Sequence, residues 1–198
     1  DTGMRAEWVI ADRYWNPELC HRLTEKALAM PARDAQIGLD RKADDNVRRS
    51  KLRFITKEMA DKDATWRLMF DDLWRLAMWA NDEYFDFRIT RLSSVQIAEY
   101  DCRDRGEYKR HHDVFWFGNG DRRYHRKLSV VIQLSDPVTY TGGGFQFYDL
   151  FKDYPDQSRS RQQGSAIIFP SFTYHAAMPV LSGTRYSVAA WFEGPKWA

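Results

Sequence analysis

The sequence has few cysteines and no long apolar run. Its 198 residues include only Cys20 and Cys102. Two isolated cysteines build neither a disulfide framework nor a zinc site, so we expect a reducing, cytoplasmic environment. No apolar stretch has the length of a membrane span, and we expect no membrane partner. Residues Asp1 to Met4 lack the basic and apolar segments of a secretory signal, so we expect no intact signal peptide and take Met4 as the natural first residue.

The sequence also lacks an excess of charge. Its formal net charge is +2, which by itself is too small to indicate a nucleic-acid partner. Hydrophobic residues make up 43% and aromatic residues 15%, which excludes a disordered chain and indicates a globular protein. A chain of this length suits one domain with a sizeable core. We expect a single domain over residues 1–198, with helical support at about 1–85 and a β-rich core at about 86–198.

The N-terminal part of the chain carries the helical patterns. A short strand is expected at residues 8–10, and Asn16 is a suitable cap for a helix over residues 17–30, which begin with a proline. Residues 32–49 are polar and aperiodic and predict an exposed loop. Between residues 59 and 84, apolar side chains recur at three- and four-residue steps. This periodicity predicts one amphipathic helix packed on a sheet.

The C-terminal part consists of short β-rich runs separated by Gly, Pro, Asp and Ser. Helices followed by many short strands indicate an α+β fold whose β part is a jelly roll or a small barrel. The expected strands are residues 94–100, 128–134, 144–148, 165–169 and 185–192.

His111 and Asp113 form a His-x-Asp motif. Along an extended strand, residues i and i+2 point to the same face, so both side chains can reach one metal while His112 points away. The third ligand must come from another strand, and His175 is the candidate, just beyond an apolar run. Two imidazoles and a carboxylate are the ligands of the facial triad that holds non-haem Fe(II). Arg185 follows ten residues later and can grip a carboxylate with two hydrogen bonds.

These motifs belong to segments that resemble a known family. The C-terminal half is similar to the Fe(II)/2-oxoglutarate-dependent dioxygenases, and within them to the prolyl 4-hydroxylase-like branch. Short single-domain members of this branch are typical of bacteria and phages, so the resemblance implies a bacterial or phage origin. The segments occur in the order of the family and are residues 100–113 (YDCRDRGEYKRHHD), 127–148 (KLSVVIQLSDPVTYTGGGFQFY) and 164–191 (GSAIIFPSFTYHAAMPVLSGTRYSVAAW).

The resemblance implies a double-stranded β-helix core that holds Fe(II) through His111, Asp113 and His175. The co-substrates would be 2-oxoglutarate and O2, which are converted to succinate and CO2 as the substrate is hydroxylated. Ascorbate is the expected reductant. The resemblance requires no protein general base, so no catalytic side chain beyond the metal ligands is assigned.

Four residues are expected in the co-substrate pocket. Arg185 matches the basic residue that pairs with the C5 carboxylate of 2-oxoglutarate, and Ser187 lies where some members place a hydroxyl on the same carboxylate. Tyr100 matches a tyrosine that contacts the co-substrate in the hypoxia-type prolyl hydroxylases. Gln133 departs from the family, because the animal enzymes tend to carry a tyrosine there, which indicates a differently arranged pocket.

The resemblance favours a prolyl residue in a peptide or protein as the substrate. Candidate substrate contacts are Tyr108, Trp116 and Trp191, although Tyr108 and Trp191 would serve equally well as packing residues. Residues 34–50 and 115–126 are candidate lids over an extended peptide. Further candidates in the second loop are Phe117, Arg122 and Arg123.

Other functions compete with this one. A free amino acid or small metabolite is the main alternative, and an acidic one would need a further buried cation such as Lys109, Arg110 or Arg126. A nucleic-acid demethylase is disfavoured, because that branch usually carries a second arginine six residues after the first, where this chain has Trp191. A cupin-like binding module with a vestigial metal site is disfavoured by the intact ligand set. Two further histidines, His21 and His125, lack any such context and are expected on the surface.

Overall fold

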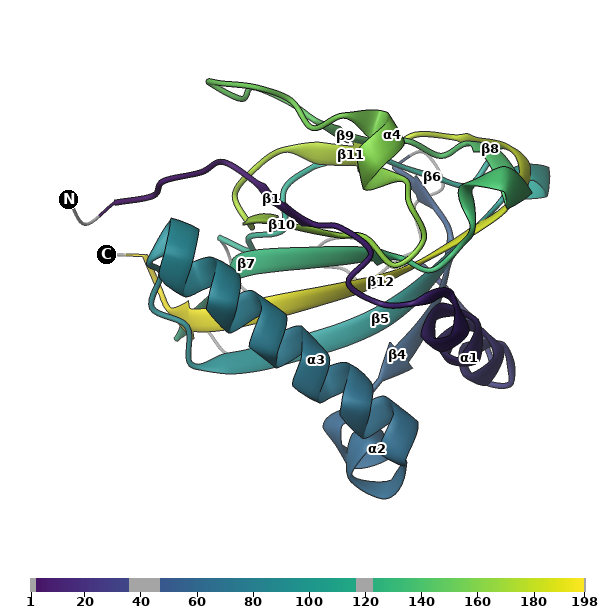
Figure 1. The fold of residues 1–198 in the computed structure, drawn as a ribbon, viewed down its shortest axis with the longest axis horizontal. Helices are drawn as coiled ribbons and strands as arrows, with labels where there is room; N and C mark the ends of the chain where they lie inside the picture. The colour runs from purple at the N-terminus through teal and green to yellow at the C-terminus, as the bar shows by residue number, and fades with distance from the viewer. Residues whose placement is uncertain (1–2, 36–46, 117–122, 198) are drawn as a thin grey trace.

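The computed structural model describes residues 3–35, 47–116 and 123–197, and its strands form two antiparallel sheets (Figure 1). The predicted combination of helices and antiparallel strands is confirmed. The larger sheet has the order β1 (Val9–Ala11), β10 (Ala166–Pro170), β7 (Tyr124–Gln133), β12 (Val180–Pro195), β5 (Arg91–Asp101), β4 (Lys51–Ile55) and β2 (Arg33–Asp34), with β8 (Tyr140–Gly142) paired to β12. The smaller sheet has the order β3 (Arg48–Arg49), β6 (Glu107–His111), β11 (His175–Ala177) and β9 (Phe145–Phe147).

The helices cover one face of the larger sheet. α1 (Pro17–Leu28) begins where predicted, and the Asn16 side chain accepts a hydrogen bond from the Leu19 amide at 2.8 Å. Figure 1 shows α3 (Ala64–Ala80) running across β7, β12 and β5. Within the described residues, no helix combines the length and apolarity needed to cross a bilayer. The remaining short turns are η2 (Cys102–Asp104), η3 (Pro137–Thr139) and α4 (Gln157–Ser160).

The single helix predicted for residues 59–84 is wrong. The segment contains α2 (Lys57–Lys62), then α3, and then the π-helical turn η1 (Asn81–Phe85). Asp63 separates α2 from α3, because it is extended (φ −135°, ψ 120°) and its carboxylate accepts hydrogen bonds from the Thr65 and Trp66 amides. A carboxylate at the N-cap satisfies otherwise unpaired amides, so a new helix starts there although the apolar periodicity continues.

Two further expectations are only partly correct. They are the loop at residues 32–49 and the helical character of the first part of the chain. β2, β3 and β4 join the sheets from this region, and β4 pairs with β5. β4 was missed because its alternation is hidden by Arg53, which is buried and ion-paired to Glu99 at 2.9 Å. Residues 36–46, which make up most of the first proposed lid, lie outside the described residues. Residues 117–122 of the second proposed lid, including Phe117 and Arg122, also lie outside them.

Alternation along β5 and β12 gives the larger sheet two different faces. One face packs on the helices, through residues such as Val95, Ile97, Val188 and Ala190, which share a buried core with Met69 and Leu73 of α3. The opposite face turns towards the smaller sheet and lines a cavity there. The residues of β5 and β12 that line this cavity are Gln96, Ala98, Tyr100, Arg185, Ser187, Ala189 and Trp191.

Candidate metal centre

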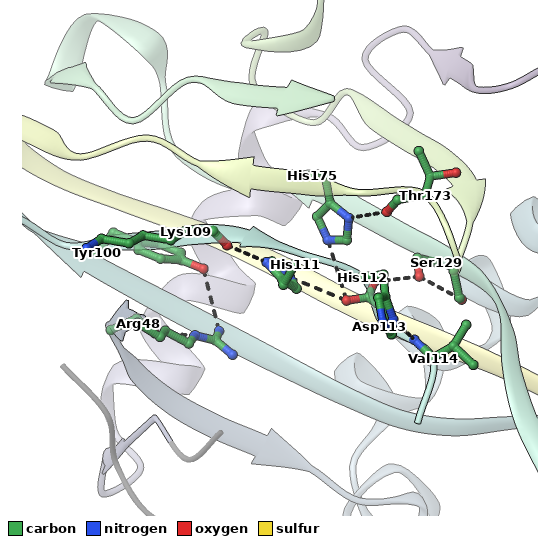
Figure 2. A network of polar contacts seen from close by, with 12 residues as sticks. Arg48, Tyr100, Lys109, His111, His112, Asp113, Val114, Ser129, Thr173 and His175 are labelled. Carbon is green, nitrogen blue, oxygen red and sulfur yellow. Dashed lines mark hydrogen bonds and ion pairs between the residues drawn. The ribbon is translucent and has the colours of Figure 1, made fainter. Parts of the chain in front are cut away.

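His111, Asp113 and His175 converge at the smaller sheet. β6 ends at His111, β11 begins at His175, and these two residues are direct partners in the antiparallel register. Asp113 lies just beyond β6 and not within a strand, yet its Oδ1 is 3.4 Å from Nε2 of each histidine. Figure 2 shows both imidazoles directed at the Asp113 carboxylate. One potential ligand atom from each residue lies within 4.8 Å of the others, which is a geometry suited to one metal ion.

Backbone carbonyls fix both imidazoles in the tautomer that a metal requires. Nδ1 of His111 lies 2.7 Å from the Lys109 carbonyl oxygen, and Nδ1 of His175 lies 2.8 Å from that of Thr173. A carbonyl oxygen only accepts, so each Nδ1 carries the proton and each Nε2 presents its lone pair to the centre. Burial also lowers the pKa of His111, which favours the neutral, ligating form.

A hydroxyl pair supports the carboxylate. Ser129 Oγ donates to Asp113 Oδ2 at 2.7 Å and lies 2.9 Å from Ser171 Oγ (Figure 2). The Asp113 amide also donates to the Ser171 carbonyl oxygen at 2.8 Å. Burial opposes the charge of Asp113, but when the neighbouring imidazoles are protonated their charges and hydrogen bonds outweigh it and hold the pKa of the carboxyl well below its usual range. Asp113 is therefore ionised, and its Oδ1 faces both histidines.

Arg185 is buried at one end of the same cavity. Its side chain is 2% exposed, and Nε donates to Gln133 Oε1 at 3.0 Å. Its guanidinium lies 5.3 Å from the centre of the Tyr100 ring, which is its register partner on β5. Ser187 lines the cavity two residues further along β12. All four residues expected in the co-substrate pocket thus lie together, and Gln133 contacts Arg185 directly.

The three candidate substrate contacts fall into two groups. Tyr108 and Trp191 line the cavity with the ligand set, whereas Trp116 does not. Tyr108 lies flat against His111, with ring centroids 3.4 Å apart and planes 12° apart. Trp116 is 45% exposed and lies edge-on to His125, 5.3 Å between centroids, so it belongs to the surface beside the cavity.

The structure corrects some histidine and cation assignments. His125 was expected on the surface but is buried, while His21 is exposed as predicted. His112 points away from the metal ligands, as predicted, and its Nδ1 accepts a hydrogen bond from the Val114 amide at 3.1 Å. Among the three candidate cations, Lys109 and Arg110 are exposed and Arg126 is partly buried.

Two polar cavity residues were missed from the sequence. Arg48 is 6% exposed and Gln96 is 4% exposed, and both line the cavity. Arg48 comes from the two-residue strand β3 inside a polar, aperiodic segment, which gave no local signal. Gln96 occupies an inward position in β5, and only the strand register shows which way that position faces.

Known structures share this fold. A prolyl-4-hydroxylase from Pseudomonas putida aligns with a TM-score of 0.72 at 17% identity, over 95% of this chain and 93% of that chain. A prolyl hydroxylase from Trichoplax adhaerens, in complex with a hypoxia inducible factor oxygen degradation domain peptide fragment, aligns with a TM-score of 0.73 at 16% identity, over 94% and 83%. At these identities the likeness establishes the fold alone.

Sequence comparison identifies the family. A PKHD-type hydroxylase of Synechococcus elongatus is 36% identical over 103 residues, which cover 52% of this chain and 44% of that protein. A PKHD-type hydroxylase of Hyphomonas neptunium is 34% identical over 93 residues, which cover 46% and 40%. The chain thus matches less than half the length of these relatives. The model of the 2OG-Fe(II) oxygenase superfamily matches residues 95–193, half of the chain, and includes all three metal-ligand candidates and Arg185, so this chain belongs to the 2OG-Fe(II) oxygenase superfamily.

Proposed function

We propose that the protein is an Fe(II)- and 2-oxoglutarate-dependent hydroxylase that acts on a prolyl residue in a peptide or protein. One observation carries the proposal: His111, Asp113 and His175 meet in the cavity whose far end holds the buried Arg185. Two neutral imidazoles and one carboxylate suit Fe(II) and leave coordination positions open. When bound, iron and 2-oxoglutarate supply the oxidising chemistry that hydroxylates the substrate and releases succinate and CO2.

The metal would be held by Nε2 of the two histidines and by Oδ1 of Asp113. These three side chains fit a metal ion, because each Nδ1 donates a hydrogen bond to a backbone carbonyl oxygen and each Nε2 faces the Asp113 carboxylate. Ser129 keeps Asp113 Oδ2 engaged, which leaves Oδ1 for the metal. The protein contribution here is to hold these ligands in place before the metal arrives.

Arg185 would bind the far carboxylate of 2-oxoglutarate. In the part of the chain that the structure describes, its guanidinium has an amide oxygen as partner and no carboxylate. A buried guanidinium with spare donors is suited to a bidentate bond with an incoming carboxylate. Gln133 would set the orientation of Arg185, while Tyr100 and Ser187 complete the wall around it.

The substrate would approach from the end of the cavity that Trp191 lines, six residues along β12 from Arg185. The similarity to PKHD-type hydroxylases and the fold shared with prolyl hydroxylases support a peptidyl proline as the target. Tyr108 would cover His111 on the same side. O2 would be the second co-substrate, and ascorbate would keep the iron reduced between turnovers.

We also propose that the two sheets form the double-stranded β-helix that the resemblance implies, and that residues 1–198 act as one catalytic domain. Both sheets contribute to the cavity, through β5 and β12 of the larger sheet and β6 and β11 of the smaller.

The deciding experiment measures succinate formed from 2-oxoglutarate in the presence of Fe(II), O2 and ascorbate. Proline-rich peptides and a panel of free amino acids would serve as substrates, with mass spectrometry to detect the gain of one oxygen atom. We expect turnover with a proline-containing peptide and none in the His175→Ala variant. Oxygen incorporation only into a free amino acid would favour the small-molecule alternative, and absence of both turnover and Fe(II) binding would favour a binding module.

A further inference from the structure

Two arginines near the metal ligands have no acidic partner within the described residues. Arg48 is buried, Arg126 is partly buried, and neither forms an ion pair with a described Asp or Glu. Arg53, another buried arginine of the fold, does have such a partner in Glu99. Because burying an unpaired charge is costly, these two side chains call for an explanation beyond packing.

Arg48 reaches the cavity from β3. Its Nε donates to Ser50 Oγ at 2.7 Å, and one terminal nitrogen lies 3.5 Å from the Tyr100 hydroxyl (Figure 2). The guanidinium also lies 4.3 Å from the centre of the Tyr108 ring, whose stacking partner is the metal ligand His111. Arg48 is therefore next to the metal ligands, separated from His111 by one aromatic ring.

Arg126 approaches from β7. Its guanidinium lies 4.1 Å from the centre of the Trp191 ring and 4.5 Å from that of Phe115, and one nitrogen is 3.5 Å from Ser94 Oγ. Trp191 lines the cavity, so Arg126 contacts one ring of the cavity wall. Burial lowers the pKa of Arg126, while the nearby carboxylates of Asp113 and Glu193 oppose that shift. Both guanidinium groups thus contact aromatic rings that line the cavity, Tyr108 in the case of Arg48 and Trp191 in the case of Arg126.

The charge balance of the cavity is positive even when its cofactors are counted. Fe(II) carries two positive charges and 2-oxoglutarate two negative ones, which cancel. Asp113 offsets one of the two arginines that line the cavity, Arg48 and Arg185, so one positive charge is left. Arg126 adds a second one behind the Trp191 ring, and the nearby Glu193 is already ion-paired to Arg91. An anion bound between Arg48 and Arg126 would offset this positive charge and gain charge-assisted hydrogen bonds. The side-chain amide of Gln96, directed into the same cavity, adds a further donor.

We propose that Arg48 and Arg126 together bind a carboxylate of the substrate, so that the enzyme hydroxylates molecules with an anionic group close to the oxidised carbon. The inference rests on the proposed function and narrows its substrate class. The carboxylate has two possible sources: a free amino acid or chain end supplies its α-carboxylate, and an acidic side chain supplies one inside a peptide. Both present the same chemistry to the two guanidinium groups.

The test compares matched acids and amides as ligands. Protein loaded with Fe(II) and 2-oxoglutarate, without O2, is titrated with N-acetyl-L-proline and N-acetyl-L-prolinamide, and with blocked peptides containing Pro-Asp or Pro-Asn, by calorimetry. We expect the acid of at least one pair to bind about tenfold or more tightly than its amide, as a charge-assisted contact gives. The pair that shows the preference identifies the source of the carboxylate.

Variants assign the preference to the two arginines. Arg126→Gln and Arg48→Gln should each remove most of the acid preference, and Arg126→Lys should restore part of it. Arg110→Gln is the control, since Arg110 is exposed on the neighbouring rim and ion-paired to Asp149. Melting temperatures check that every variant is folded. Three results would overturn the proposal. They are equal affinities for the acid and the amide in both pairs, no binding of any ligand, and a preference for the acid that persists in both Gln variants.

The same samples separate this inference from the function on which it rests. Absence of succinate from the wild type under O2 with every substrate would reject the oxygenase function. Succinate and oxygen incorporation with amides and acids alike would keep the oxygenase function and reject only the anion site.

Discussion

Tyr108 lies between His111 and Arg48, with its ring 3.4 Å from the imidazole centroid on one side and 4.3 Å from the guanidinium carbon on the other. Burial raises the pKa of Tyr108 to about 12, so the phenol is neutral throughout the physiological range. The ring therefore shields His111 and separates it from a positive charge.

Removing this shield should weaken the metal site. We expect Tyr108→Leu to lower Fe(II) affinity about tenfold, because the ring that orients His111 is lost. Tyr108→Phe keeps the stacked ring and should bind the metal nearly as well as the wild type. Metal titrations followed by calorimetry give both values. Equal losses in the two variants would mean that the hydroxyl, and not the ring, supports the site.

The ligand assignment predicts opposite results for neighbouring residues. Asp113→Ala should abolish Fe(II) binding and the rise in melting temperature that the metal causes, whereas His112→Ala should retain both. The reason is geometric, since Asp113 Oδ1 faces both imidazoles and His112 is directed at the Val114 amide. The reverse pattern would identify His112 as the ligand in place of Asp113.

Ser129 should affect the metal without contacting it. Its hydroxyl orients Asp113 through Oδ2, so Ser129→Ala should lower metal affinity about tenfold. Ser135→Ala is a matched control, because the Ser135 hydroxyl accepts from the Tyr186 amide away from the ligands. Calorimetric titration with Mn(II) in place of Fe(II) avoids oxidation. An unchanged affinity in Ser129→Ala would remove the hydroxyl pair from the metal site.

Arg185 and Gln133 should control the use of 2-oxoglutarate. Arg185→Ala is expected to raise the 2-oxoglutarate concentration needed for turnover at least about a hundredfold, because a bidentate charged contact is lost. Gln133→Ala should have a smaller effect in the same direction, since it frees Arg185 Nε from its partner. Metal affinity should be retained in both. Loss of metal with unchanged 2-oxoglutarate affinity would contradict the assignment.

Asp63 offers a prediction on stability and pH. The Lys26 ammonium, 2.5 Å away, and the capped amides lower the pKa of Asp63. Because the pKa of Asp63 is lower in the folded than in the unfolded protein, its ionised form stabilises the fold at pH values above the unfolded pKa of about 4. This contribution is lost as the pH falls through the folded pKa. We expect Asp63→Ala to reduce the free energy of unfolding by about 1 kcal/mol at pH 7.

Asp63→Asn separates the two roles of this side chain. Asparagine still caps α3 but cannot titrate, so the variant should lose less stability and show a weaker dependence on pH below about 4. Urea unfolding at pH 7 and pH 3 measures both effects. A wild type and Asp63→Asn with the same pH dependence would show that the Lys26 contact contributes nothing.

Short-range features could be read directly from the sequence. The Asn16 cap and most of the strands of the larger sheet depend on residues only a few positions apart. Local periodicity and spacing encode such features because backbone geometry fixes which neighbours share a face. Failures arose where another force overrode the pattern, as at Asp63, whose cap divides one periodic stretch into two helices.

The sequence by itself determined the chemistry of the candidate metal centre: the types of its proposed ligands, their spacing and the later arginine. Tertiary structure alone decided which distant residues join that centre. The pairing of β6 with β11 places His175 opposite His111, and the pairing of β12 with β5 places Arg185 beside Tyr100. Arg48 lines the same cavity from β3, and Arg126 contacts Trp191 of the cavity wall from β7. No local pattern could show this, because strand register between remote segments sets which side chains meet.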